Sequence, residues 1–470
     1  MYVEEVLYLT VRELADRIRT GAMSPVELTE SYLERAKRLG PRWNAYALLT
    51  PELALQQARV AQREIRAGHY RGPLHGIPYA AKDLLAVRGL PTTWGARPYA
   101  AQQFDFDATV VTRLREAGAV LLGKAAMIEL AGGMGYRYAS ASLTGATKNP
   151  WNAGCWTCGS SSGPGAIVAG ALAGFAIGTE TWGSIICPSA YCGISGLRPT
   201  YGRVSRHGGM VLCSSLDKIG PMARSATDCG TVLAAIAGHD PLDASSLAAG
   251  EAAFAYPGAG AWPRALRVGW IAEQMKGAQP GIVAAVDSAR QALVKAGAKV
   301  ADAKLPEGPW EAAAGVIVSV EGASAFDELI SSGRCLELTD PLGKIGGLVN
   351  QQIGGTDYLR AMRARRVLQR KMAEMLRGYD VLAAASQNVT AVKLDANLET
   401  DTGGADPLGA IGNLCGLPAI SVPCGFDASG LPVGLQFVGA LLGEHAVLGA
   451  AELYQRHTDW HRKHAPASRG

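Results

Sequence analysis

The sequence has little net charge and no long run of basic residues. Its 45 Lys and Arg residues nearly balance its 41 Asp and Glu residues, which gives a formal net charge of +4 over 470 residues. Nucleic acids and anionic membrane surfaces are bound mainly through clustered positive charge. The charge balance therefore argues against both, and we expect a small, neutral partner.

The sequence also lacks an apolar run long enough to span a membrane. The longest one, residues 163–178, is rich in Gly and Ala and is shorter than the roughly 20 residues that a transmembrane helix needs. Glu4, Glu5, Glu13 and Asp16 interrupt the region in which a signal peptide would be continuously apolar. We expect a soluble, cytoplasmic protein that is a monomer or a homodimer.

Cysteine is sparse, and its number is odd. The nine cysteines are scattered along the chain, unlike the dense framework of a small secreted protein, so we expect reduced thiols. Cys155 and Cys158 form a CxxC pair, but no second pair follows at a metal-ligand spacing. His457 and His461 have helical spacing without a third ligand and are better explained as a solvated helix face. We therefore expect no metal and no organic cofactor.

Short apolar segments are abundant, in a chain that is 48% hydrophobic. Segments typical of buried strands alternate with segments of helical period. This alternation predicts an α/β fold, a mixed β-sheet covered by helices on both faces. The strand candidates are GIPYAAKDLLAV, AVLLGKAAM, LRVGWIA, VLAAAS, AISVPCG and VGLQFVG, and the helix candidates are VTRLREAG, IVAAVDSARQALVKAG and YLRAMRARRVLQRKMAEML.

An early helix is predicted at SPVELTESYLERAKRLG, where Ser24 caps, Pro25 suits the first turn and Glu27 completes a capping box. The segment 240–265 is rich in Pro, Gly, Ser and Ala and is expected to be a surface loop or an internal boundary. We expect a single domain over residues 1–470. Its parts are an N-terminal helical part at 1–70, a catalytic core at 72–230 and the rest of the α/β fold at 266–470.

Three polar features stand in apolar surroundings: Lys82, the serine cluster CGSSSGPG at 158–165, and Ser184. Singly, each has an ordinary explanation as a snorkelling lysine or a turn serine. Together they allow a mechanism, because a desolvated lysine has a lowered pKa and accepts protons. A cluster serine would relay the proton from Ser184, whose oxygen attacks a carbonyl. The Gly-rich backbone before Ser184 would supply N–H groups for the oxyanion.

Residues 159–163 also match the GxSxG elbow of α/β-hydrolases. That elbow requires a strand immediately before it, whereas we interpret the preceding NPWNAGCWTC as a loop. The serine cluster is therefore not expected to form such an elbow.

The chain resembles the amidase signature family in sequence blocks that follow the family order from about residue 72 to residue 440. The blocks are GIPYAAKD, GATKNPWN, GSSSGPGAIVAGALAGFAIGTETWGSIICPSAYCGISGLRPTYGRVS, SSLDKIGPMARSATD, GLPAISVPCGF and GLPVGLQFVG. The resemblance implies the amidase signature fold and a catalytic triad. In that triad Lys82 is the base, Ser160 is a bridging serine that follows a cis peptide bond, and Ser184 is the nucleophile.

The resemblance further implies an oxyanion hole built from the backbone N–H groups of Thr181, Trp182, Gly183 and Ser184. Ser161 and Ser162 are expected to support the backbone of the serine cluster, and Thr179, Glu180 and Asp217 to brace the site. A purely structural role explains each of these five residues at least as well.

The sequence departs from the family pattern at two positions. Trp182 replaces the first of two usual glycines, which would disturb the oxyanion hole if that position needs φ > 0. Ile186 stands where many relatives carry an arginine, a residue that suits a charged substrate. With Trp182, Ile186 and Cys187 at the substrate site, and Met134 at the pocket wall by its position in the family pattern, we expect a neutral aryl or alkyl substrate.

The leading hypothesis is a hydrolase that cleaves a linear amide, anilide or carbamate (urethane) C–N bond through an acyl-enzyme on Ser184, with esterase side activity. An alternative is the amidase subunit of a tRNA-dependent amidotransferase, which resembles this chain in the same blocks. The missing arginine after Ser184 argues against it. A third hypothesis, a binding protein without catalysis, is disfavoured because Lys82, Ser160 and Ser184 are all present.

Overall fold

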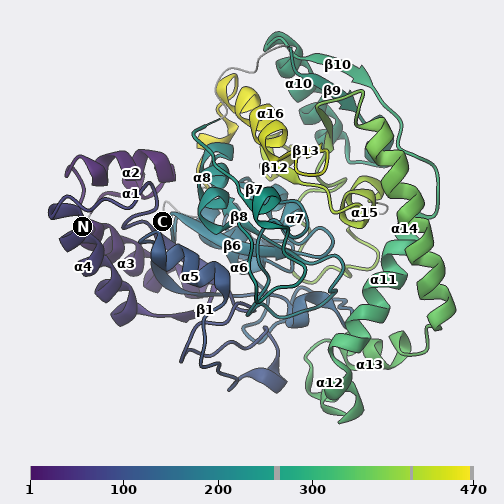
Figure 1. Ribbon diagram of the computed structural model, residues 1–470, viewed down its shortest axis with the longest axis horizontal. Helices are drawn as coiled ribbons and strands as arrows, with labels where there is room; N and C mark the ends of the chain where they lie inside the picture. The colour runs from purple at the N-terminus through teal and green to yellow at the C-terminus, as the bar shows by residue number, and fades with distance from the viewer. Residues whose placement is uncertain (1, 259–264, 403–405, 466–470) are drawn as a thin grey trace.

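An 11-stranded mixed sheet lies at the centre of the computed structural model, which describes residues 2–258, 265–402 and 406–465 (Figure 1). The strand order is β1-β3-β2-β6-β8-β7-β12-β13-β11-β9-β10. The strands are β1 (Tyr46–Leu49), β2 (Pro78–Lys82), β3 (Val120–Ala125), β6 (Phe175–Glu180), β7 (Ser195–Arg198), β8 (Lys218–Ala223), β9 (Arg267–Trp270), β10 (Lys299–Asp302), β11 (Val381–Ala385), β12 (Ala419–Phe426) and β13 (Pro432–Gly439).

The pairing of the strands explains why their sequences are apolar on both faces. β2 pairs in parallel with β3 and β6, and β11 with β9, whereas β8, β7, β12 and β13 pair with their neighbours in antiparallel. Every residue of β2, β3, β11 and β13 is buried. Because helices cover both faces, such strands are continuous apolar runs. The predicted mixed α/β fold is confirmed, and all six strand candidates contain a strand.

Helices α1–α4 form one end of the molecule, and α11 and α14 form the opposite end (Figure 1). All three helix candidates contain a helix. The helices are α1 (Glu4–Leu7), α2 (Val11–Arg19), α3 (Pro25–Trp43), α4 (Pro51–Arg66), α5 (Thr109–Glu116), α6 (Ser162–Ala169), α7 (Ile186–Cys192), α8 (Ala226–Ile236), α9 (Ala249–Ala252), α10 (Pro280–Lys295), α11 (Trp310–Ala325), α12 (Asp327–Ser331), α13 (Pro341–Asn350), α14 (Gly355–Met375), α15 (Pro407–Leu414) and α16 (Glu444–Arg456). No helix in the described ranges is long and apolar enough to cross a membrane.

The predicted start of α3 is partly correct. Ser24 caps the helix by accepting the N–H of Glu27 at 3.3 Å. The reciprocal bond that would complete a capping box is found instead one helix earlier, between Thr10 and Glu13 at the start of α2. At Ser24 the hydroxyl donates to Gln62 of α4, at 2.6 Å, so this cap also joins two helices.

Two loop predictions need correction. NPWNAGCWTC, which begins at Asn149, forms most of a hairpin of β4 (Lys148–Asn149) and β5 (Asn152–Trp156), separate from the main sheet. Asn149 forms its turn by accepting the N–H of Trp151, and the N–H of Trp156 donates to Val392, a distant partner that local sequence does not reveal. The segment 240–265 includes the short helix α9, and its residues 259–264 lie outside the described residues.

Candidate active site

The candidate site lies where β2 and β6, two parallel neighbours, come to their carboxyl ends. Lys82 is the last residue of β2, and Glu180 is the last residue of β6. The chain after β6 makes a sharp turn through Ser184 into α7. We call residues 181–186 the nucleophile turn, after the role that the sequence predicts for Ser184. Since parallel strands end at one edge of a sheet, side chains far apart in sequence meet here.

The amine of Lys82 is surrounded by hydroxyl groups. The side chain has no exposed surface, and its Nζ lies 2.8 Å from Oγ of Ser160, 3.0 Å from Oγ of Ser161 and 2.9 Å from Oγ1 of Thr179. Burial lowers the pKa of Lys82 to about 7, although the charges of Asp217 and Glu180 act in the opposite direction. Burial therefore brings loss of the proton from this amine toward neutral pH.

The serine cluster is tied to β6 and to the nucleophile turn. The peptide bond between Gly159 and Ser160 is cis. Ser161 Oγ donates to the carbonyl of Thr179 and accepts its N–H, and the N–H of Ser161 donates to the carbonyl of Ser184 at 3.4 Å. Ser162 accepts a hydrogen bond from Thr147 at 3.1 Å. The structure thus brings Lys82, the cluster and the turn that carries Ser184 into one site.

The backbone of the nucleophile turn presents free donors. Gly183 has φ +81°, whereas Trp182 is not among the residues with positive φ, so the tryptophan is accommodated without the strain that a left-handed conformation would impose. Within the described part of the chain, no acceptor takes the N–H of Trp182, Gly183 or Ser184. Three unoccupied amides beside a serine are the arrangement that an oxyanion hole requires.

Carboxylates hold the nucleophile turn at both of its ends. Glu180 Oε2 accepts the N–H groups of Ile185 and Ile186 at 2.8 and 3.0 Å, and its Oε1 pairs with Arg198 at 2.6 Å. Burial raises the pKa of Glu180, but the charges of Arg198 and Lys218 outweigh burial and hold it at about 2. At the other end, Thr181 donates to Asp217 at 2.5 Å.

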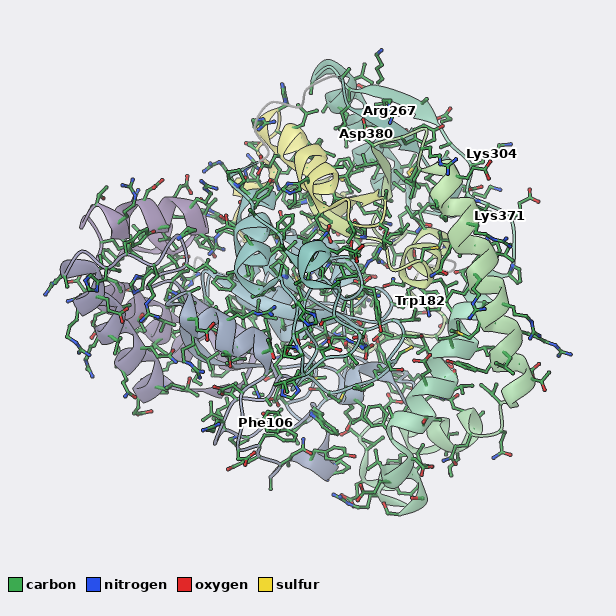
Figure 2. All side chains as sticks on the ribbon, in the orientation of Figure 1. Phe106, Trp182, Arg267, Lys304, Lys371 and Asp380 are labelled. Carbon is green, nitrogen blue, oxygen red and sulfur yellow. A yellow bond between two sulfur atoms is a disulfide. The ribbon has the colours of Figure 1, made fainter. Side chains whose placement is uncertain are left out.

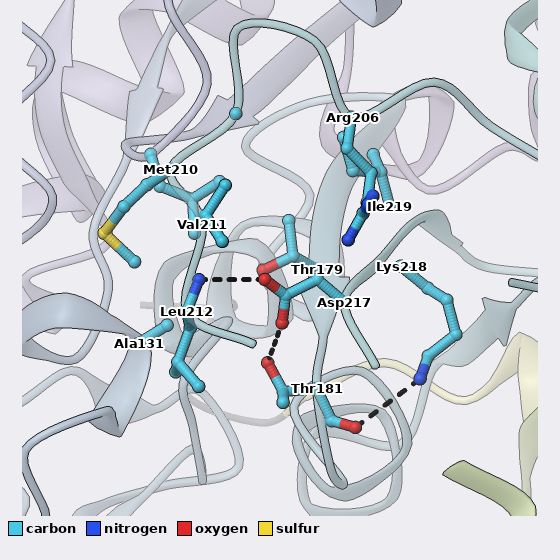
Figure 3. A pocket seen from close by; sticks show the side chains of 12 residues that line it. Ala131, Thr179, Thr181, Arg206, Met210, Val211, Leu212, Asp217, Lys218 and Ile219 are labelled. Carbon is cyan, nitrogen blue, oxygen red and sulfur yellow. Dashed lines mark hydrogen bonds between the residues drawn. The ribbon is translucent and has the colours of Figure 1, made fainter. Parts of the chain in front are cut away.

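A small pocket opens beside Thr179 and Thr181 (Figure 3). Its three charged lining residues already have partners within the protein. Asp217 accepts the N–H groups of Leu212 and Cys213, Lys218 donates to the carbonyl of Thr181, and Arg206 donates to the carbonyl of Ser214. The remaining lining side chains are largely apolar: Leu84, Ala131, Met210, Val211, Leu212 and Ile219.

Comparison with known proteins adds a match over nearly the whole chain. The family model described as Amidase matches residues 27–448. The chain belongs to the Amidase family. It is an amidase-family hydrolase that acts on C–N bonds, as the sequence resemblance implied.

Two related proteins align with this amidase over nearly its whole length. The A subunit of glutamyl-tRNA(Gln) amidotransferase from Geobacter metallireducens is 35% identical and covers 98% of this chain and 99% of its own length. The protein of the same name from Acinetobacter baumannii is 36% identical, with 97% of each chain covered.

Solved structures share the fold. The peptide amidase of Stenotrophomonas maltophilia has a TM-score of 0.83 at 32% identity, with 96% of each chain covered. A 6-aminohexanoate cyclic dimer hydrolase in complex with its substrate has a TM-score of 0.84 at 27% identity, with 99% of this chain and 100% of that chain covered.

The expectation of reduced thiols is wrong for two of the nine cysteines in this amidase. Cys158 and Cys187 form a disulfide, and the other seven are free and buried. The two are 29 positions apart, but Cys158 is the first residue of the serine cluster and Cys187 is the second residue of α7, three positions after Ser184, so the fold places them together. The disulfide connects the two loops that carry Ser160 and Ser184.

The predicted substrate-binding residues are placed differently from one another. Ile186 is 3% exposed and Cys187 is in the disulfide. Met134 is 2% exposed and packs against Gly347 of α13, while Met210 lines the pocket. Trp182 is half-buried, and its Nε1 donates to Asp406 at 3.0 Å. A substrate contact for each of the four predicted residues stays a prediction.

Sequence reasoning missed Arg198 and Asp406, because their partners Glu180 and Trp182 are remote in the chain. Arg198 lies in a buried strand, within the segment GLRPT. Because arginine is almost never fully buried without a partner, its place there is the one local signal of a buried ion pair. Among the described residues, no cluster of three or more His, Cys, Asp or Glu side chains could hold a metal ion.

Proposed function

We propose that this amidase hydrolyses linear amide, anilide or carbamate bonds through an acyl-enzyme on Ser184. The observation that carries the proposal is the setting of Lys82, a fully buried amine whose hydrogen-bond partners in the described structure are hydroxyls, with Ser160 at 2.8 Å. An amine with a pKa of about 7 is suited to accept and return a proton near neutral pH.

The proposed reaction has two half-reactions. Ser184 Oγ attacks the carbonyl carbon while its proton moves through Ser160 to neutral Lys82. The oxyanion that forms accepts hydrogen bonds from the N–H groups of the nucleophile turn. The C–N bond then breaks as Lys82 returns the proton through Ser160 to the leaving nitrogen. Water attacks the acyl-enzyme by the same proton path and releases the acid.

The pocket beside Thr179 and Thr181 favours a neutral, apolar group, although Ser160 and Ser184 are not among the residues that line it. Asp217, Lys218 and Arg206 are bonded within the protein, so they offer a charged substrate no unpaired partner. Esters, which have a better leaving group, should also be hydrolysed. We also propose that the enzyme is cytoplasmic and works as a monomer or a homodimer.

The alternative is a component of a tRNA-dependent amidotransferase, and the end-to-end identity of 35–36% with two such proteins favours it. Ile186 favours the independent hydrolase, because this side chain is apolar and buried at a position where many relatives carry an arginine.

An assay of the purified chain without any partner separates the two functions. Its substrates are a neutral aryl p-nitroanilide, the matching phenyl carbamate and the matching ester. We expect hydrolysis by the chain alone and its loss in Ser184→Ala. Activity that is restricted to glutamine and requires the other amidotransferase components would overturn the proposal in favour of the alternative.

A further inference from the structure

Trp182 occupies a position in the nucleophile turn where the family pattern has glycine, and its side chain is fixed by a residue 224 positions away. The indole Nε1 donates to Oδ2 of Asp406 at 3.0 Å. Both residues are partly buried, and Trp182 also packs against the main hydrophobic core. Figure 2 labels Trp182 within the side chains of the whole molecule.

Asp406 is itself held from three directions. Its Oδ1 accepts the side-chain N–H of Gln274 at 2.8 Å and the backbone N–H of Gly409 at 3.1 Å, which caps α15. Its own N–H donates to Glu311 of α11 at 2.6 Å. Gln274, which is 2% exposed, in turn accepts the N–H of Leu408 at 2.9 Å. The acceptor that the indole reaches is therefore a fixed point of the scaffold.

This anchor matters because few other hydrogen bonds hold the middle of the turn in the described structure: the carbonyls of Gly183 and Ser184 accept the N–H groups of Cys187 at 2.8 Å and of Ser161 at 3.4 Å. The N–H groups of Trp182, Gly183 and Ser184 are left free for the oxyanion, so they cannot hold the backbone in place. Thr181 is fixed through Asp217, and Ile185 through Glu180. Between these two points, the Trp182 side chain adds the hydrogen bond that ties the turn to the start of α15.

We propose that Asp406 is a positioning residue for catalysis, which holds the Trp182 indole and thereby aims the oxyanion N–H groups of the nucleophile turn. The inference rests on the proposed function, since it presumes that this turn stabilises an oxyanion next to Ser184. A carboxylate on the N-terminal cap of α15 thus fixes a turn that contains one glycine fewer than the family pattern. A displacement of about 1 Å at such a site costs up to about a hundredfold in rate.

Two conservative variants test the contact from its two sides. Trp182→Phe keeps an aromatic ring and removes the donor. Asp406→Asn keeps one oxygen, which the two donors from Gln274 and Gly409 require, and so gives up the acceptor for the indole. We expect each to lower kcat on a neutral aryl ester about tenfold, with KM within about twofold. The double variant should be no slower than either single variant, because both remove one contact.

Asp427→Asn is the matched control, since Asp427 accepts hydrogen bonds from Ser429 and Leu431 in a turn outside the site. It should leave kcat unchanged. A thermal unfolding midpoint measured for every variant separates misfolding from misalignment, and Trp182→Phe keeps the test valid if Asp406→Asn does not fold.

Two results would overturn the inference alone: kcat within twofold of the parent for Trp182→Phe, or a double variant whose loss is the product of the single losses. Full activity in Ser184→Ala is a different outcome. It would overturn the proposed function, and the inference with it.

Discussion

Glu180 and Arg198 form an ion pair at 2.6 Å in which both side chains are at most 1% exposed. The same carboxylate accepts the N–H groups of Ile185 and Ile186, directly after Ser184. The pair thus links the stability of the sheet to the geometry of the site, since Arg198 is the last residue of β7 and Glu180 the last of β6.

Glu180→Gln should destabilise the protein and slow the enzyme together. Removing one partner of a buried pair leaves the other charge uncompensated, which costs about 3 kcal/mol of unfolding free energy. Because the folded-state pKa of Glu180 is held at about 2, below its usual value of 4.5, the stabilisation is present above pH 4.5 and is lost as the pH falls toward 2.

Urea unfolding as a function of pH measures this effect. Asp357→Asn removes the exposed pair with Arg360 and serves as the control, with an expected change below about 0.5 kcal/mol. Equal stability of Glu180→Gln and the parent at pH 7 would contradict the assignment.

The pH dependence of activity should follow Lys82. Its pKa is lowered from 10.5 to about 7 by burial, so the neutral, proton-accepting form grows as the pH rises through 7 and dominates above 8. We expect kcat/KM to rise with an apparent pKa near 7 and then level off. Lys82→Ala should lose about a thousandfold, and its residual rate should keep rising with pH as hydroxide replaces the amine. A flat parent profile between pH 5.5 and 9 would exclude Lys82 as the base.

The fold was largely predictable from the sequence because its strands are local patterns. The strand VLAAA, for example, is apolar throughout, and burial on both faces requires that composition. The hairpin of β4 and β5 was missed, since Asn152, Ala153 and Gly154 are exposed and the strand is ordered by a distant carbonyl, Val392.

The sequence predicted those site residues whose type alone is unusual in their surroundings. Lys82 and the serines are polar residues in apolar runs, and the structure brings them together. Contacts between remote segments leave no such pattern. Asp406 lies 224 residues from Trp182, and the Cys158–Cys187 disulfide has no spacing that distinguishes it from the other cysteines.

The disulfide predicts how many cysteine thiols can be alkylated before and after reduction. Alkylation of the denatured protein without reductant should label seven cysteines, and labelling after reduction should reach nine. Closing a loop of 29 residues constrains the unfolded chain, so Cys158→Ser with Cys187→Ser should lower the unfolding free energy by about 3.5 kcal/mol. Nine labelled thiols in unreduced protein would show that the bond does not form.

Gly183→Ala tests the backbone of the nucleophile turn. A β-carbon at this position meets no atom within 4 Å, so the cost is conformational: φ is +81°, a region that L-residues enter at about 1–2 kcal/mol. We expect kcat to fall by about tenfold with little change in KM. Gly315→Ala in α11 is the matched control, because it also has free space but a helical backbone, and it should add up to about 1 kcal/mol of stability. Full kcat in Gly183→Ala would mean that the left-handed conformation is not needed.

The covalent intermediate gives the most direct test of the proton path from Ser184 through Ser160 to Lys82. The enzyme is quenched in acid while it turns over a neutral aryl ester, digested, and analysed by mass spectrometry. The account predicts an acyl group on Ser184 in the parent, a strongly reduced yield in Lys82→Ala and Ser160→Ala, and none in Ser184→Ala. An acyl group on another residue, or equal acylation of Ser184 without Lys82, would contradict it.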